Sequence, residues 1–159
     1  MAPKTGEIKI AFKGFNWSSA FWAGIAFAVI GQVVRMIGAL LTMSYYLDPA
    51  FFGVWSPLMM PSNAAPPVSF FVLSFVVNFG LGAMFFALFS WVRPVIDTKN
   101  PSRATISFSS LVFGLSIVPY TASLLLLINL PLLLILEWAV ESLAIFLVWT
   151  YVVARLIKT

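Results

Sequence analysis

The chain has 159 residues, of which 62% are apolar and 9% are charged, whereas about 25% of the residues of a soluble domain are charged. Nine basic and five acidic side chains give a net charge of +4, and so few charges cannot cover the surface of a soluble fold. There is no His and no Cys, which excludes a disulfide scaffold, the usual ligands of zinc, haem and iron–sulfur clusters, and Cys–His or Ser–His catalysis.

Four apolar stretches are long enough to cross a bilayer, which takes about 20 mainly apolar residues in a helix. They cover approximately residues 19–45, 68–92, 106–128 and 131–157. We therefore expect an all-α membrane protein, a four-transmembrane-helix bundle in which the whole chain forms a single integral membrane domain. We expect no cofactor and no metal site.

The first apolar stretch follows an N-terminal arm that carries Lys4, Lys9 and Lys13, an arrangement also found in signal peptides. The apolar core of a signal peptide has about 7–15 residues, and the stretch 19–45 is nearly twice as long. We expect it to be retained as a membrane helix, with Asn16 in its N-terminal cap.

The connection at residues 47–67 is the longest, and it is apolar rather than polar. Asp48 followed by Pro49 is typical of a helix start, because Asp caps the first turn and Pro suits the first helical position. Apolar side chains that include Phe51 and Trp55 follow. Their exposure to water would be costly, so we predict a short interfacial helix over the end of the bundle. The alternative is a lid or a docking surface for another subunit.

The basic residues indicate the orientation in the membrane. The connections at 47–67 and 129–130 carry none, whereas the two chain ends and the remaining connection carry eight: Lys4, Lys9, Lys13, Arg93, Lys99, Arg103, Arg155 and Lys158. The positive-inside rule then predicts a multi-pass protein of the cell membrane with both termini in the cytoplasm. These charges are scattered, so they indicate contact with the lipid bilayer and no nucleic-acid partner.

Six of the polar or ionisable residues inside the predicted spans form a candidate polar cluster, because ionisable residues within a membrane are candidates for function. They are Gln32, Arg35, Asn78, Tyr120, Glu137 and Glu141. At 1.5 Å per residue, Arg35, Asn78 and Glu141 each lie about 14–15 Å below the outer ends of their helices. The similar depths predict that the four helices bring these side chains together in one polar cluster.

Small residues follow one stripe of the first predicted helix. Gly24, Ala28, Gly31, Arg35 and Gly38 recur at spacings of three or four residues, which places them on one face. Small side chains let membrane helices approach closely. We therefore expect the four small residues to pack against other helices, and Arg35 to point into the bundle.

The predicted cluster contains two glutamates but only one arginine. Arg35 fits a carboxylate through two parallel hydrogen bonds, so we expect an ion pair with Glu137 or Glu141. The other carboxylate then needs a proton, a cation or a basic group from a partner protein. Two interpretations stay open: the cluster fixes the register of the helices, or it forms a proton or ion relay or the polar end of a ligand pocket.

Three functions are compatible with this sequence. The small size, the short loops and the apolar outer connection favour an accessory or assembly subunit of a larger membrane complex, with other membrane protein subunits as partners. The alternative is an oligomeric proton- or ion-coupled transporter or channel that uses Arg35, Glu137 and Glu141. An intramembrane enzyme is the least supported, because no nucleophile or metal ligand accompanies the two glutamates.

Overall fold

The computed structural model describes residues 15–61, 65–96 and 100–156. All the regular secondary structure of these residues is helical. Four helical segments are long and apolar enough to cross a membrane: Trp17–Leu41, Val68–Val95, Pro101–Leu127 and Leu132–Leu156. The predicted all-α four-helix bundle is confirmed. Five of the basic residues used to predict the orientation lie outside the described residues: Lys4, Lys9, Lys13, Lys99 and Lys158.

The first spanning helix, α1 (Trp17–Leu41), starts where the sequence predicts and ends early. The side chain of Asn16 accepts a hydrogen bond from a backbone N–H of the first turn at 3.0 Å, which caps the helix. The predicted continuation through residue 45 is wrong, because the helix is interrupted at Thr42 and a separate short helix follows, α2 (Met43–Tyr46). The Thr42 hydroxyl donates to the Gly38 carbonyl at 2.8 Å, a bond that favours bending of a helix.

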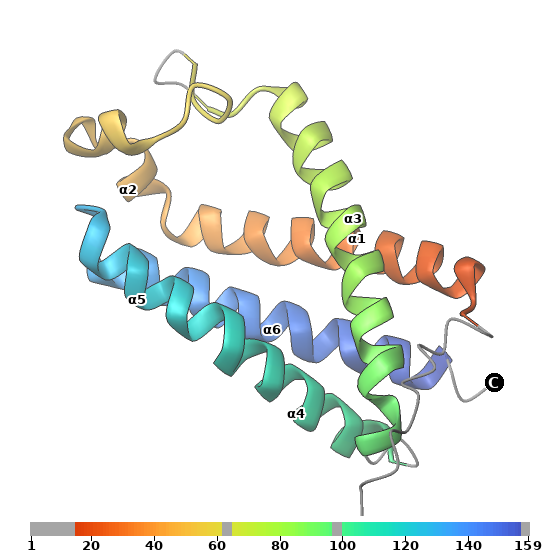
Figure 1. Ribbon diagram of the computed structural model, residues 1–159. Helices are drawn as coiled ribbons and strands as arrows, with labels where there is room; N and C mark the ends of the chain where they lie inside the picture. The colour runs from red at the N-terminus through yellow and green to blue at the C-terminus, as the bar shows by residue number, and fades with distance from the viewer. Residues whose placement is uncertain (1–14, 62–64, 97–99, 157–159) are drawn as a thin grey trace, which may run out of the picture.

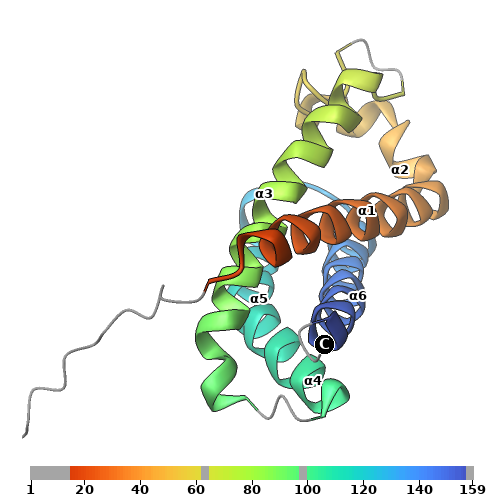
Figure 2. The same cartoon turned by 90° about the vertical axis from the view of Figure 1, so that its right-hand side faces the viewer.

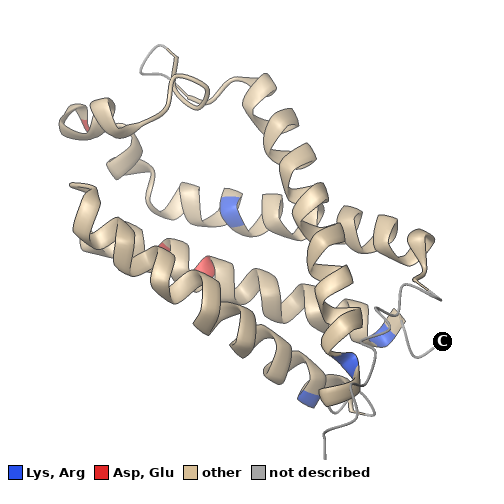
Figure 3. Ribbon diagram, in the orientation of Figure 1, with Lys and Arg blue, Asp and Glu red and all other residues tan. Residues whose placement is uncertain are grey.

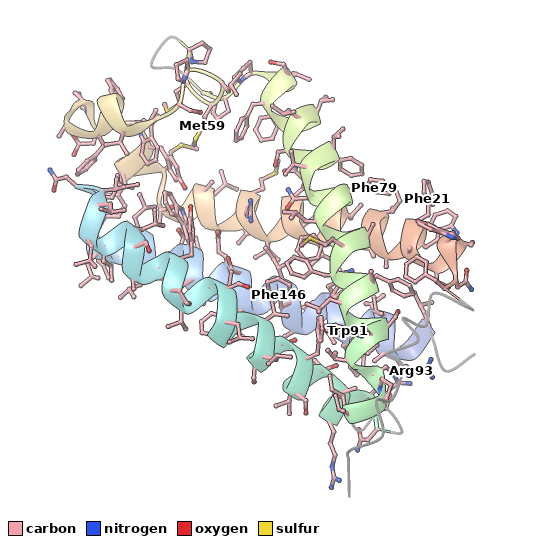
Figure 4. The ribbon with its side chains drawn as sticks, in the orientation of Figure 1. Phe21, Met59, Phe79, Trp91, Arg93 and Phe146 are labelled. Atoms are coloured by element: carbon pink, nitrogen blue, oxygen red, sulfur yellow. The ribbon has the colours of Figure 1, made fainter. Side chains whose placement is uncertain are left out.

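The connection between the first two spans contains the predicted short helix. η1 (Pro49–Val54) is a 3-10 helix, and the Asp48 carboxylate accepts a hydrogen bond from a backbone N–H of its first turn at 2.9 Å. The helix ends where Trp55 adopts an extended backbone conformation. Figure 4 shows Met59 beneath this connection, on the side of the helices. We call the end of the molecule that carries this connection the loop end.

The second spanning helix, α3 (Val68–Val92), crosses α1 and continues into the short turn η2 (Arg93–Val95). Figures 1 and 2 show the crossing from two sides. Two glycines allow it, because a Cβ on Gly82 would lie 3.0 Å from the Cα of Gly24, and a Cβ on Gly24 would lie 2.8 Å from the carbonyl oxygen of Phe79. The backbones of α1 and α3 are therefore in close contact at this point.

The third span begins earlier than predicted and is not a uniform helix. Asn100 accepts hydrogen bonds from two N–H groups of the first turn, and a proline occupies the first position, so α4 (Pro101–Val112) starts about one turn before residue 106. A π-helical turn, η3 (Phe113–Ile117), separates it from α5 (Val118–Leu127). Pro119 lies two residues after this turn; it lacks a backbone N–H, and a wider turn accommodates the lost bond.

The last spanning helix, α6 (Leu132–Leu156), lies antiparallel to the third span and packs on it and on α1. Figure 1 shows that α3 separates from α5 toward the loop end. Figure 3 shows the ribbon positions of the described basic residues outside α1 at the opposite end of the molecule. They are Arg93, Arg103 and Arg155, and we call this the basic end. The predicted orientation relative to the cytoplasm stays a prediction.

The hydrophobic core lies toward the basic end. Its large buried side chains are Phe27, Phe86, Phe89, Phe108, Phe146 and Trp149. Figure 4 shows Phe146 pointing from α6 toward α3, where its ring lies 4.8 Å from that of Phe85. The indole N–H of Trp149 donates to the carbonyl of Ala23 at 2.8 Å. The four spans are thus joined by aromatic packing in one half, whereas the loop-end half is more open.

Candidate functional site

The six polar residues of the predicted cluster do not all meet. Two of them lie in the contact between α1 and α3. The amide of Gln32 donates to the carbonyl of Phe71 at 3.0 Å. The amide of Asn78 donates to the carbonyl of Ser74 at 2.7 Å, and its oxygen faces Gly31. The hydrogen bond of Gln32 therefore joins α1 to α3, whereas Asn78, which is 4% exposed, is bonded within α3 and packs on Gly31.

Two others, Glu137 and Glu141, lie one turn apart on α6 and face α1 at Gly38. A Cβ on Gly38 would overlap one carboxyl oxygen of each glutamate, and it would lie 2.7 Å from the carboxyl carbon of Glu141. A glycine at this position therefore lets both carboxyl groups reach the backbone of α1. We call Glu137 and Glu141 the glutamate pair.

The carboxyl group of Glu137 has no hydrogen-bond donor among the described residues. Both of its oxygens are buried and unpartnered. The Thr42 hydroxyl, which lies beside it, donates to the Gly38 carbonyl instead. The indole N–H of Trp138 donates to the hydroxyl of Tyr46 at 2.8 Å. Buried acceptors without a donor are costly, so the carboxyl group of Glu137 is not satisfied by the described residues of the bundle.

The predicted ion pair between Arg35 and a glutamate is not formed within the described part of the chain. Arg35 is exposed on the surface of the bundle. One reason is depth: because α1 ends at Leu41, Arg35 lies about 9 Å from the end of the helix instead of about 14 Å. The other is direction, since positions 35 and 38 differ by about 60° around the helix axis, and it is Gly38 that faces α6.

Tyr120, the sixth residue, lies apart from the others. It is 59% exposed on α5, and no hydrogen bond joins it to another described residue. The π-helical turn before α5 has more residues per turn than an α-helix. The residues that follow this turn therefore point in other directions around the helix axis than they would in a continuous α-helix. The depth of Tyr120 along the span does not show which way its side chain points.

The small residues of the α1 stripe are buried: Gly24, Ala28, Gly31 and Gly38. They face two different helices, because Gly24 and Gly31 lie against α3 and Gly38 lies against α6. A single stripe therefore serves two contacts at different heights along α1. Because of this division, Asn78 on α3 and the glutamate pair on α6 lie in two separate contacts instead of one cluster.

An aromatic cluster lies beside the glutamate pair, and the contact between its rings was not predicted from the sequence. The Tyr46 and Trp55 rings are stacked with centroids 5.0 Å apart, and the Trp138 ring lies 6.3 Å from that of Trp55. Burial raises the pKa of the Tyr46 hydroxyl, and the hydrogen bond from Trp138 acts in the opposite direction. The available signal was the position of Trp138 directly after Glu137.

The site has few chemical groups. Within residues 15–61, 65–96 and 100–156, no set of three or more His, Cys, Asp or Glu side chains could hold a metal ion. The functional groups are two carboxyls in contact and an exposed guanidinium on the neighbouring helix. The four long apolar helices that carry these groups indicate a small multi-pass membrane protein. The chain matches no protein-family model, no curated protein and no solved structure.

Proposed function

We propose that the protein is an accessory or assembly subunit of a larger membrane complex, in which a partner subunit provides hydrogen-bond acceptors for Arg35. The supporting observation is the exposure of Arg35 within α1, without an ion pair to any described residue. A charged side chain inside a membrane span costs about 2.5–3.5 kcal/mol on insertion scales. Five guanidinium donors without an acceptor among the described residues add to this cost.

The surroundings of Arg35 suit a membrane-embedded partner. Met36, beside Arg35 on α1, is large, apolar and about half exposed, and α3 separates from α5 toward the loop end (Figure 1). Polar groups on membrane helices associate through interhelical hydrogen bonds. The partner that fits is therefore a transmembrane helix with a carboxylate or amide at the depth of Arg35.

Site-specific photocrosslinking in native membranes tests the subunit role. The probe replaces Ala39, one turn after Arg35 on the same face, and the control probe replaces Ile37 on the other side of α1. We expect a crosslink to a different membrane protein from position 39, which is lost in Arg35→Leu, and only lipid adducts from position 37. Lipid adducts alone from position 39 would mean that Arg35 extends to the membrane surface without a partner, and would contradict the subunit role.

The glutamate pair favours a second candidate, an oligomeric proton- or ion-coupled transporter or channel. Unsatisfied intramembrane carboxyls are typical of proton relays, and these two lie on the loop-end half of α6. This function predicts crosslinks between copies of the chain from position 39. It also predicts a pH-gradient-driven flux in liposomes that Glu137→Gln abolishes.

A further inference from the structure

The two carboxyl groups of the glutamate pair meet at one point against α1. One oxygen of each occupies the place where a Cβ of Gly38 would stand, so the two groups are within hydrogen-bonding reach of each other. An ionised carboxylate has only acceptor atoms. Two acceptors in contact, with both oxygens of Glu137 buried and without a donor among the described residues, need a hydrogen atom between them.

We propose that Glu137 and Glu141 bind one exchangeable proton between them, as a carboxylic acid that donates to a carboxylate. The proton adds to an oxygen of one glutamate, its O–H bond points to the nearest oxygen of the other, and on release it returns to water. Two like charges in contact outside water are both ionised only at high cost. A hydrogen bond from a carboxylic acid to a carboxylate is short and strong, and it satisfies the unpartnered Glu137.

The charges around the site agree with one proton. With one proton the glutamate pair carries a charge of −1, and the only charged side chain described on α1, Arg35, carries +1. The sum within this layer is then zero, whereas two ionised glutamates would leave an uncompensated negative charge. Of the tyrosines described on the neighbouring elements, Tyr46 of α2 interacts electrostatically with both glutamates, Tyr45 also belongs to α2, and Tyr120 of α5 is exposed. The other titratable groups described on α4 and α6 lie at the basic end: Arg103, Arg155 and Tyr151, which accepts a hydrogen bond from Arg155.

A divalent cation fits the glutamate pair less well. Calcium takes six to eight oxygen ligands and magnesium takes six, whereas this point of the α1–α6 contact offers two carboxyl groups. No third acidic side chain completes a metal-binding set in the part of the chain that the structure describes. The proposal does not rest on the subunit role, because the pair is complete within one chain.

Infrared spectroscopy of the purified protein in liposomes tests the shared proton. Glu7→Gln in the full chain leaves the glutamate pair as the only glutamates, and [13C]glutamate labelling identifies their bands. At pH 7 we expect the carbonyl band of one protonated carboxyl per chain. Glu137→Gln and Glu141→Gln should each remove this band, because the amide N–H then donates to the remaining carboxylate. Asp48→Asn, a charge change outside the spans, should leave it unchanged.

Each outcome bears on the proposal. No protonated glutamate at pH 7, or two of them, would overturn it. Loss of the band in only one of the two variants would assign the proton to that residue alone and would overturn the sharing. If a variant fails to keep its helical circular dichroism, a pH titration of the Glu7→Gln protein replaces it. The titration should show two separate one-proton steps, one on each side of pH 7, and a single two-proton step would contradict the proposal.

Discussion

Replacement of Gly38 by Ala places a methyl group where the glutamate pair meets α1. The new Cβ would overlap one carboxyl oxygen of Glu137 and one of Glu141, and it would lie 2.7 Å from the carboxyl carbon of Glu141, whereas ordinary contacts of a Cβ are 3.4–4 Å. Overpacking of this kind costs about 1–3 kcal/mol. Ala is also the better helix former by about 1 kcal/mol. Gly38→Ala should therefore lower the free energy of unfolding by about 0–2 kcal/mol.

The same substitution should have the opposite effect once the glutamates are truncated. In a Glu137→Ala/Glu141→Ala background the overlapping atoms are absent, so only the gain in helix propensity remains, about 1 kcal/mol. The difference between the two backgrounds is a coupling free energy of about 1–3 kcal/mol. Gly80→Ala is the matched control, because nothing lies within 4 Å of a Cβ there; its effect should be equal in both backgrounds.

The assay is reversible unfolding in mixed micelles by titration with SDS, followed by Trp fluorescence. All four combinations at Gly38 and the glutamate pair are measured in the same micelles, together with the Gly80→Ala control. An equal effect of Gly38→Ala in both backgrounds would show that the carboxyl groups do not pack on Gly38. It would refute the placement of the glutamate pair in the α1–α6 contact.

Three further predictions concern the fold and its orientation. Gly82→Ala should leave the protein about 1–3 kcal/mol less stable than Gly80→Ala in the same assay, because its Cβ overlaps a side chain of α1 and lies 3.0 Å from the α1 backbone, whereas the gain in helix propensity is the same at both positions of α3. Trp138→Phe should move the titration of Tyr46 to a still higher pH in ultraviolet difference spectra, because it removes the donor that favours the phenolate; an unchanged or lower pKa would contradict this contact. Reporter fusions at Asn63 and at the C-terminus should report opposite compartments, with the C-terminus in the cytoplasm; the same compartment for both would contradict four spans.

The existence and approximate bounds of the spans follow from the sequence, because hydrophobic length is a strong signal in a bilayer. Caps at Asn16, Asp48 and Asn100 set the helix starts that the structure shows. The interruption at Thr42 was missed because the predicted span counts Met43 and Tyr45, which follow it, as a continuation of the apolar stretch. Pro119 indicates an irregular third span, because it cannot donate a backbone hydrogen bond, but it does not indicate that the irregularity is a π-helical turn.

The candidate site shows that the depth of a side chain in the membrane does not determine which helix it contacts. Depths counted along straight helices place side chains in a layer, but they do not say which helix each one faces. The stripe of α1 faces α3 at Gly31 and α6 at Gly38, so the amide of Asn78 and the glutamate pair separate although their depths agree. The exposure of Arg35 depends on a rotation of about 60° and on the early end of α1, and neither follows from spacing.

The central claim is the contact of the glutamate pair with Gly38, and solid-state NMR of the protein in bilayers measures it directly. Glycine labelled at Cα and glutamate labelled at the carboxyl carbon are introduced into Glu7→Gln protein. The carboxyl carbon of Glu141 lies 2.7 Å from the Cβ position of Gly38, which places it within about 4.2 Å of the Cα, given a C–C bond of about 1.5 Å. We predict a strong Gly Cα–Glu carboxyl cross-peak that Glu141→Gln weakens and that Glu137→Gln/Glu141→Gln removes; the absence of any such cross-peak in the parent protein would contradict the account.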